Sequence, residues 1–542
     1  MRVLLTLICI LLAVPVLGVL GAWLAFDAAA WAVLLHQAQT VLAGYALQSL
    51  LLAGFVACGV ALLGGGAAAA VALFEFPGRR VFEWMLLLPM AMPAYVLAYA
   101  YTDFLQYSGP LQSVLRAVSG AQQALWPDVR SLPGAVILFV LCLYPYVYLL
   151  VRTALAERGV QMMEAARLLG AGLWRRIGAV ALPLSRPALV AGVALALMET
   201  LADYGVGAYF GLATFSTGIY KAWLVMNDRI AAAQLASLLL LLVALLLWAE
   251  RRARRHLRFA STRAGSLAAS NEGRAVVLHG RLALLAWSLC AVPVVFGFAL
   301  PLVLLARLVW QEARFGAIGL PLARFAQWCL TSFQLAAVSA VMAAGLALAL
   351  AFALRVAATR TDRSWRTRLL ATAVRTVALG YALPGAVIAV GILLPVGAVQ
   401  ALWPAAPLGA IVTGSVAGLF YAYLVRFSAV ALQSIEAGYD RLPASLDDSA
   451  RMLGASRLRL LAEVHAPLLR RSVLVAALLV FVDVMKELPA TLVLRPFNSD
   501  TLAVVAYNLA RDERLAEAAL PSLAIVAVGL LPVLLLSRAT RR

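Results

Sequence analysis

Charged residues are scarce in this chain. They make up 13% of its 542 residues, whereas soluble proteins have about 25%, and hydrophobic residues make up 64%. A water-soluble fold of this size would have too little polar surface to cover itself, and the mean hydropathy of +0.94 agrees with that conclusion. The composition therefore excludes a soluble globular protein and predicts one that is integral to a membrane.

Lysine is almost absent, so the positive charge comes from arginine. Lys221 and Lys486 are the only lysines among 44 basic residues, and the formal net charge is +19. Such a basic chain could bind nucleic acid, but its arginines cluster in short loops between apolar runs. Charge in that position sets the orientation of membrane helices, so we expect the lipid bilayer as a partner and no nucleic acid.

Motifs for binding phosphate or metal are missing as well. A Walker A loop, G-x-x-x-x-G-K-[ST], would need one of the two lysines, and neither lies in that context. We therefore expect no ATP site and no enzymatic activity in the chain itself. Cysteines and histidines lie singly without C-x-x-C spacing, which favours small buried residues over a disulfide framework, and we assign no metal ligands. These residues are Cys9, Cys58, Cys142, Cys290, Cys329, His36, His256, His279 and His465.

Long apolar runs, in contrast, are frequent. A helix needs about 20 residues, at 1.5 Å each, to cross about 30 Å of hydrocarbon. Twelve runs are candidate spans, which predicts an all-α fold. The first follows Arg2 as in a secretory signal, but it exceeds the usual apolar run of about 7–15 residues, which favours a retained span. The runs are Val3–Phe26, Val41–Phe74, Val81–Tyr101, Pro133–Val151, Pro187–Ala202, Ala231–Trp248, Leu282–Trp310, Phe333–Leu354, Leu369–Val396, Leu408–Val430, Ser472–Val484 and Ala516–Leu535.

A polar tract divides the spans into two sets of six. Residues 251–280 are rich in Arg, Ser and Gly, which is typical of a linker, and they separate a first half at residues 1–250 from a second half at residues 281–542. Arginine-rich loops alternate with loops that lack Lys and Arg, such as Asp27–Thr40. The positive-inside rule then predicts that both termini and the linker are cytoplasmic. An even number of spans per half makes the halves parallel repeats, not inverted ones.

One polar segment occurs twice, 284 positions apart. The first copy is EAARLLGAGLWRRIGAVALP, Glu164–Pro183, and the second is DDSARMLGASRLRLLAEVHAP, Asp447–Pro467. In both copies an acid is followed by small residues, by a glycine after six positions and by a proline after nineteen. Both copies are predicted to lie in cytoplasmic loops, at residues 161–183 and 445–467. The matching residues are Glu164, Ala165, Ala166 and Gly170 in the first copy, and Asp448, Ser449, Ala450 and Gly454 in the second.

Each copy has the pattern of a short amphipathic helix. Apolar residues of the first copy recur at helical spacing, and acids lie at the helix start, where they complement the helix dipole. A single copy could be an interfacial helix lying among lipid headgroups. The duplication, with glycine at matching positions, favours a docking helix instead. Gly170 and Gly454 would let the helix end sharply before the chain re-enters the membrane at the proline.

This spacing resembles the EAA loop of ABC-importer permeases. The resemblance implies an inner-membrane permease of bacteria whose two loops dock on two copies of an ATP-binding subunit. ATP and Mg²⁺ would then be bound by that subunit, with no cofactor in this chain. It further implies two parallel six-helix repeats of the type I ABC-importer permease fold, and a periplasmic substrate-binding protein that largely selects the substrate.

Ionisable residues lie at membrane depth after each loop. Glu199 and Asp203 are four residues apart in the first half, and Asp483, Lys486 and Glu487 follow the second loop. Because such charges cost roughly 2.5–3.5 kcal/mol each on insertion, they usually face a partner or a cavity. Lys486 could pair with Asp483 or Glu487, or with Glu199 or Asp203 across the halves. The same residues could also line the translocation path, and both interpretations can hold together. The candidate path residues are Glu199, Asp203, Tyr204, Asp483, Lys486 and Glu487.

A second resemblance concerns the substrate. ETLADYG, FSTGIYKAW, KELPATLVLRPF and LAVVAYNLARDER are similar to segments of ferric-iron importer permeases, which fuse two six-helix halves in one chain. The resemblance implies Fe³⁺ as substrate, and acids in the path suit a hard cation. Permeases for thiamine, phosphonate, sulfate and polyamines share the same plan and stay as alternatives. The second loop departs from the family at Asp448, Ser449 and Ala466. Because Asp keeps the negative charge and Ser the small volume, we expect this loop still to dock, but less tightly. A proton-coupled secondary transporter is a further alternative, but it would not need matched loops.

Overall fold

The computed structural model describes residues 2–24, 28–255, 276–316, 319–358, 365–443 and 445–540. Within these residues the fold is helical apart from two strands of two residues each, which confirms the all-α prediction. Strands β1 (Phe74–Glu75) and β2 (Val276–Val277) pair in parallel. Residues 256–275 of the predicted linker lie outside the described residues.

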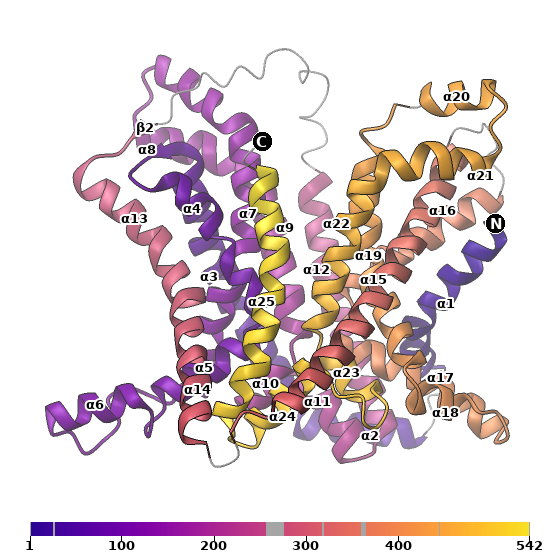
Figure 1. The fold of residues 1–542 in the computed structure, drawn as a ribbon, viewed down its shortest axis with the longest axis horizontal. Coiled ribbons are helices and arrows are strands. Elements are labelled where there is room, and N and C mark those ends of the chain that lie inside the picture. Colours follow the sequence, from indigo (N-terminus) through magenta and orange to yellow (C-terminus); the bar gives the residue numbers. More distant parts are fainter. Residues whose placement is uncertain are drawn as a thin grey trace. The chain divides into compact units, whose positions relative to one another are not determined.

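The helices of the first 255 residues include long, span-sized helices with short ones between them (Figure 1). They are α1 (Arg2–Gly21), α2 (Ala28–Thr40), α3 (Leu42–Leu73), α4 (Arg79–Met85), the 3₁₀ helix η1 (Leu88–Ala91), α5 (Ala94–Leu105), α6 (Pro110–Ser119), α7 (Leu132–Leu168), α8 (Leu173–Arg176), the π-helix η2 (Ile177–Ala181), α9 (Leu182–Ala202), α10 (Gly205–Tyr209), α11 (Phe215–Tyr220), the π-helix η3 (Lys221–Val225) and α12 (Arg229–Arg255).

The helices after residue 276 follow a similar order of long and short elements. They are α13 (Gly280–Val294), the π-helix η5 (Val295–Ala299), α14 (Leu300–Phe315), α15 (Leu322–Ala358), α16 (Trp365–Val377), the 3₁₀ helix η6 (Gly380–Ala382), α17 (Gly385–Leu402), α18 (Leu408–Gly414), α19 (Ala417–Tyr439), α20 (Ser445–Met452), α21 (Arg457–Arg459), the π-helix η7 (Leu460–His465), α22 (Ala466–Met485), α23 (Pro489–Leu494), α24 (Leu502–Arg511) and α25 (Leu515–Thr540).

Ten helices in the described part of the chain are long and apolar enough to cross a membrane. The predicted span Val81–Tyr101 lies in a pair of helical segments, Arg79–Ala91 and Ala94–Ser119, that is bent by 90° and would make an eleventh. The predicted span Ser472–Val484 lies in α22, which is not among the ten and carries three charged residues, Arg470, Arg471 and Asp483. The arrangement of twelve spans as two repeats therefore stays a prediction.

The chain forms two compact units, each built from both sequence halves. Unit 1 comprises residues 1–38, 218–240 and 321–505, and unit 2 comprises residues 39–217, 241–320 and 506–542. Helix α1 thus belongs to the unit that contains most of the second half, and helices α13 and α14 belong to the unit that contains most of the first. This division by tertiary contacts differs from the predicted division of the sequence at residues 251–280.

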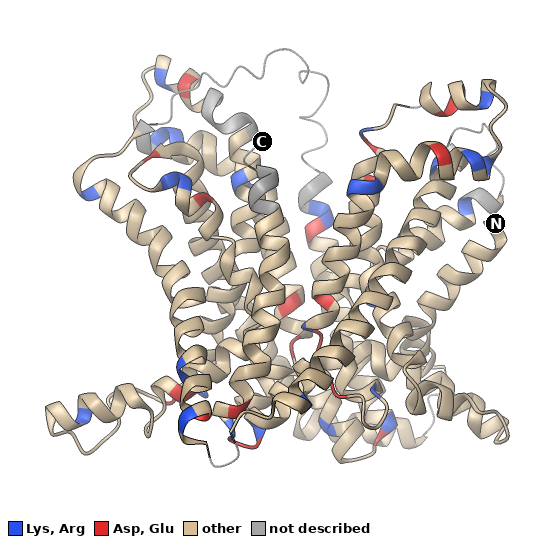
Figure 2. Ribbon diagram, in the orientation of Figure 1, with Lys and Arg blue, Asp and Glu red and all other residues tan. Residues whose placement is uncertain are grey.

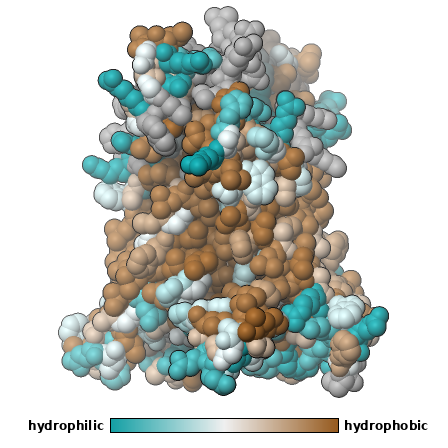
Figure 3. Space-filling view, turned by 90° about the vertical axis from the view of Figure 1, so that its left-hand side faces the viewer, coloured by the Kyte–Doolittle hydropathy of each residue, from teal (hydrophilic) through white to brown (hydrophobic). Residues whose placement is uncertain are grey.

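Unit 2 has its core where α3, α7 and α9 pack together. Glycines let the backbones approach, because a Cβ atom at Gly64 would lie 2.6 Å from the carbonyl oxygen of Tyr144, and one at Gly192 would lie 2.6 Å from the Cα atom of Val147. Close helix packing at small residues is typical of membrane bundles. Figure 2 shows the charged residues of unit 2 mainly toward its two ends. The face to which α13 and α14 contribute shows an apolar band between hydrophilic ends (Figure 3).

Unit 1 has its core where α15, α19 and α22 pack together, and α1 packs against α17. A Cβ atom at Gly391 would lie 2.1 Å from the carbonyl oxygen of Pro15, and one at Gly18 would lie 2.5 Å from the carbonyl oxygen of Gly391. Glycine on both helices is what allows this contact.

Two local breaks recur in the two sequence halves. The 3₁₀ helices η1 and η6 each end just before a proline, Pro93 or Pro384, that lies at the N-terminal boundary of the next helix. The fixed φ of proline favours this position and prevents the preceding helix from continuing. The π-helices η2 and η7 both lie within the repeated segment, after its glycine, and lead directly into α9 and α22.

Candidate functional site

The first part of the first loop is the end of a long helix. Helix α7 begins after Ser131, whose side chain accepts a hydrogen bond from the Gly134 amide, and continues for 37 residues to Leu168. At 1.5 Å per residue it is about 55 Å long, well beyond the thickness of the hydrocarbon. The prediction of a separate short helix is therefore wrong for the first loop, because Glu164, Ala165 and Ala166 belong to the last turns of α7.

The first loop turns at Gly170. Its φ of +78° lies in the left-handed region, which costs glycine little. The amide of Ala171 donates to the carbonyl of Ala166 over 3.0 Å, and the amide of Gly170 donates to the carbonyl of Arg167 over 2.9 Å. These two bonds form a Schellman cap, which satisfies carbonyls that the end of the helix leaves free.

The second loop has the same cap at Gly454. Its φ is +79°, the amide of Ala455 donates to the carbonyl of Ala450 over 3.0 Å, and the amide of Gly454 donates to the carbonyl of Arg451 over 2.9 Å. The expectation that glycine ends the helix is thus confirmed in both loops. We call the end of each capped helix, at residues 168–170 and 452–454, the tip of its loop. The shared cap gives the two tips one local backbone conformation.

An exposed apolar pair precedes each cap. Leu168 and Leu169 are 88% and 87% exposed, and Met452 and Leu453 are 89% and 88% exposed. Nothing lies within 4 Å of a Cβ atom built on Gly170 or on Gly454. Two large apolar side chains held in the open by a stable turn can form part of a surface that another molecule covers.

The predicted docking residues lie on the same turns as these tips. Ala165, Asp448 and Ser449 are exposed, and Glu164, Ala166 and Ala450 are half-buried. Arg451, on the same helix, places its Nη1 atom 3.6 Å from the Oδ1 atom of Asp448. Their role in docking stays a prediction.

The second loop also contains a buried acid that the sequence did not single out. Asp447 is 1% exposed, and its carboxylate contacts Arg355 on α15 and His465 at the end of η7 (2.9 Å each). Burial alone would raise the pKa of Asp447, but the hydrogen bonds from Arg355 and His465 outweigh it and hold this pKa below its ordinary value. Sequence reasoning gave Asp447 only a favourable interaction with the helix dipole.

The ionisable residues after the second loop are paired within unit 1. Lys486 Nζ lies 2.9 Å from Asp483 Oδ1, one of the pairings left open by the sequence. Glu487 is 5% exposed and pairs instead with Arg426 of α19, at 3.2 Å. Its carboxylate also accepts hydrogen bonds from the amides of Ala490 and Thr491, which caps α23. Arg426 was missed, although an arginine within the apolar run YAYLVRFSAV is a signal that could have been noted.

The corresponding residues of the first half lie in unit 2. Asp203 accepts a hydrogen bond from the Val206 amide over 2.8 Å and so caps α10, as Glu487 caps α23. The Tyr204 hydroxyl accepts a hydrogen bond from the Tyr507 hydroxyl over 3.2 Å. Glu199 is half-buried on α9. Capping is thus one role of Asp203 and Glu487, and the pathway role of all these residues stays a prediction.

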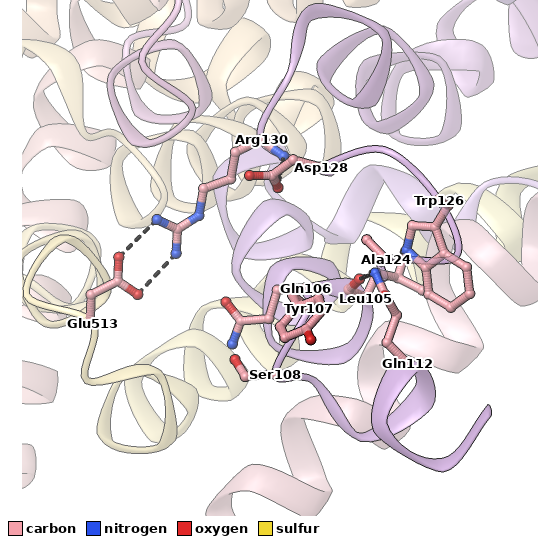
Figure 4. A pocket seen from close by; sticks show the side chains of 10 residues that line it. All are labelled: Leu105, Gln106, Tyr107, Ser108, Gln112, Ala124, Trp126, Asp128, Arg130 and Glu513. Atoms are coloured by element: carbon pink, nitrogen blue, oxygen red, sulfur yellow. Dashed lines mark hydrogen bonds and ion pairs between the residues drawn. The ribbon is translucent and has the colours of Figure 1, made fainter. Parts of the chain in front are cut away.

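A polar pocket of about 340 Å³ lies in unit 2, near the end of the unit opposite α8 (Figures 1 and 4). Arg130 holds Glu513 there through two hydrogen bonds of 2.8 and 2.9 Å. Glu513 has a φ of +61°, a strained value for a residue with a side chain. The pocket is lined by Leu105, Gln106, Tyr107, Ser108, Gln112, Ala124, Trp126, Asp128, Arg130 and Glu513.

Metal-binding side chains are not clustered in the part of the chain that the structure describes, where no group of three or more His, Cys, Asp or Glu residues could hold an ion together.

Comparison with known proteins shows similarity over part of this chain. Residues 61–259 match the family described as binding-protein-dependent transport system inner membrane component. The putative 2-aminoethylphosphonate transport system permease protein PhnU of Salmonella typhimurium is 26% identical over 196 residues, which are 36% of this chain and 68% of PhnU.

Two further relatives from Escherichia coli K12 carry other names. The molybdenum transport system permease protein ModB is 30% identical over 135 residues, 25% of this chain and 57% of ModB. The sulfate transport system permease protein CysT is 28% identical over 180 residues, 32% of this chain and 63% of CysT. Over residues 61–259, which contain the first loop, this chain is therefore similar to the inner-membrane components of binding-protein-dependent transport systems, the permease family of ABC importers.

Proposed function

We propose that this chain is the membrane-spanning permease of an ATP-driven importer. The observation that carries the proposal is the repeated tip: an exposed apolar pair, Leu168–Leu169 or Met452–Leu453, held before a Schellman cap at a left-handed glycine. Each tip would enter a groove on one of two ATP-binding subunits. Those subunits bind ATP and Mg²⁺ and carry out hydrolysis, and this chain converts their movement into transport.

The coupling depends on how each loop is joined to the membrane helices. In the first loop, Glu164, Ala165 and Ala166 extend α7 without a break, so a force on the tip acts directly on a spanning helix. In the second loop, Asp448, Ser449 and Ala450 lie on the short helix α20. Gly170 and Gly454 set the exit direction of the chain in both.

We further propose twelve spans in two parallel repeats, with the type I permease fold. The alternation of arginine-rich loops and the recurrence of the breaks at η1 and η6 and at η2 and η7 support this arrangement. Both loops, the linker 251–280 and both termini would then face the cytoplasm of a bacterium, and the opposite end of the protein would receive a periplasmic substrate-binding protein.

Two kinds of observation bear on the substrate. The motifs after each loop resemble ferric-iron permeases, whereas the relatives carry the names of 2-aminoethylphosphonate, molybdenum and sulfate permeases. We retain ferric iron as the first substrate to test. Phosphonate and sulfate are its direct competitors, because two of the named relatives carry the names of permeases for these anions. The proposed path residues are Glu199, Asp203, Tyr204, Asp483, Lys486 and Glu487.

Reconstituted transport tests this function. The full chain would be placed in proteoliposomes with its ATP-binding subunit and binding protein, and uptake of labelled Fe³⁺, 2-aminoethylphosphonate and sulfate would be measured with and without ATP. ATP-dependent uptake of one solute supports the permease function and identifies the substrate class. Uptake that follows a proton gradient and ignores ATP would instead indicate a secondary transporter and contradict the proposal.

A further inference from the structure

The two loops are joined to their units in different ways. Helix α7 runs unbroken from Leu132 to Leu168, so the first tip is the end of a spanning helix. Helix α19 ends at Tyr439, and α20 begins only at Ser445. Consecutive backbone hydrogen bonds therefore connect the first tip to its spanning helix, and the second tip lacks that connection.

A buried polar cluster lies where the connection is missing. Asp447 on α20 places its Oδ2 atom 2.9 Å from Nε of Arg355 on α15, and its Oδ1 atom 2.9 Å from Nε2 of His465. The hydroxyl of Tyr439, the last residue of α19, lies 3.1 Å from Nδ1 of His465. We call these four residues the Asp447 cluster. Through it, α20 is joined to α15, to α19 and to the π-helical turn that leads into α22.

The bonding of the cluster is complete with a neutral histidine. Tyr439 then donates to Nδ1 of His465, and Nε2–H donates to Asp447, while Arg355 also donates to the carbonyl of Leu442 over 3.0 Å. Asp447 and His465 are each 1% exposed. Such a network is strong because little water competes for its hydrogen bonds.

The first half contains apolar residues at the corresponding positions. The residues 284 positions before Arg355, Tyr439, Asp447 and His465 are Val71, Leu155, Met163 and Ala181, and none is more than 5% exposed. Apolar side chains can therefore fill this site, and they avoid the cost of burying charge. The charged cluster is present in the half whose helix is broken.

We propose that Asp447 is a positioning residue that ties the second docking loop to the membrane helices, in place of the continuous helix of the first loop. Its importance for transport rests on the proposed permease function, but the tie itself does not. Asp447 is buried within unit 1, so it acts through Arg355 and His465 on the helices that must move.

Hydrogen exchange on the full chain without any partner tests the tie. In Asp447→Asn the ion pair is lost, and the amides of α20 should exchange about tenfold faster. A buried hydrogen bond to a charged group shifts the equilibrium for local opening of the helix by a factor of about ten or more, and amides exchange from the open state. The end of α7 should be unchanged. Asp440→Asn, at an exposed position in the break between α19 and α20, is the matched control and should leave both segments unchanged. An unaltered α20 in Asp447→Asn overturns the proposal.

A paired substitution separates the tie from a general loss of folding. Asp447→Met alone leaves the half-buried Arg355 without its carboxylate, whereas Asp447→Met with Arg355→Val installs the residues that the first half has at these positions. Exchange in α20 should be slower in the double variant than in the single one. A double variant that exchanges as fast as the single one would show that the two residues do not act as a pair, and it would overturn the proposal.

Transport measurements decide the role in coupling. In proteoliposomes, the ATP-binding subunit in complex with Asp447→Asn should still hydrolyse ATP. That complex should move fewer solute molecules per ATP than the complex with the unchanged chain. An unaltered ratio contradicts the coupling role. If the unchanged chain moves no solute with ATP, but the amides of α20 exchange faster in Asp447→Asn, the proposed function fails and the tie is supported.

Discussion

The Nη1 atom of Arg426 lies 3.2 Å from the Oε1 atom of Glu487, and neither side chain is more than 9% exposed. The same carboxylate accepts the amide hydrogens of Ala490 and Thr491. This ion pair therefore connects the middle of α19 to the first turn of α23. It gives Glu487 a structural role in unit 1 beside its proposed place in the translocation path.

Loss of Arg426 should destabilise the chain strongly. Arg426→Met leaves the buried carboxylate of Glu487 without its cation, and breaking such a pair costs on the order of 3–5 kcal/mol. We expect a lower thermal transition in detergent, followed by tryptophan fluorescence. Arg459→Met is the control, because Arg459 and Glu463 form a pair with both side chains at least 60% exposed, and exposed pairs contribute less than about 1 kcal/mol. Equal shifts for both variants would contradict the structural role of Arg426.

The left-handed glycines should be essential to both tips. Alanine at Gly170 or Gly454 would hold a Cβ atom in the left-handed region at a cost of about 1–2 kcal/mol. We expect Gly170→Ala and Gly454→Ala to lower ATP-dependent uptake while membrane insertion persists. Gly172→Ala is the control, since Gly172 has no positive φ and no atom within 4 Å of its added Cβ. Uptake that falls equally in Gly172→Ala would mean that the cap is not the cause.

The exposed apolar pairs should contribute to docking and not to folding. Replacing Leu168 and Leu169 with serine, or Met452 and Leu453 with serine, removes side chains that are at least 87% exposed and so bury little within the chain. We expect an unchanged thermal transition and a loss of co-purification with the ATP-binding subunit. A transition lowered by several degrees would instead show that the pairs pack within the chain, contrary to this prediction.

The Arg130–Glu513 pair should persist well into the acidic range. The hydrogen bonds from Arg130 lower the pKa of Glu513 below its ordinary value, so the stabilisation is complete above the unfolded pKa of about 4.3. It is lost only as the pH falls through the lowered pKa. Trp126 lines the same pocket, so its fluorescence should change when Glu513 is protonated. The fluorescence of Trp126 is obtained by subtracting the signal of the Trp126→Phe variant at each pH of an acid titration. The transition should be absent in Glu513→Gln, and a transition that remains there would assign it to another group.

Neighbouring residues show the limit of sequence reasoning. Asp447 and Asp448 are adjacent acids at the start of one helix, and the repeat singles out Asp448 because it aligns with Glu164. In the structure Asp448 is exposed, whereas Asp447 is buried against Arg355, which is 92 residues away in the chain. No local pattern distinguishes them, because the difference depends on which side of α20 faces α15.

The sequence by itself determined the membrane class, most of the spans and both glycine turns. Each of these depends on residues that are close together in the chain: a long apolar run must be helical in lipid, and a glycine that ends a helix is free to adopt a left-handed φ. The tertiary structure alone decided the pairing of Arg426 with Glu487, the burial of Asp447 and the membership of α1 in unit 1. These depend on packing between helices that are far apart in the sequence, where the cost of burying a charge is offset only by a partner that the fold brings to it.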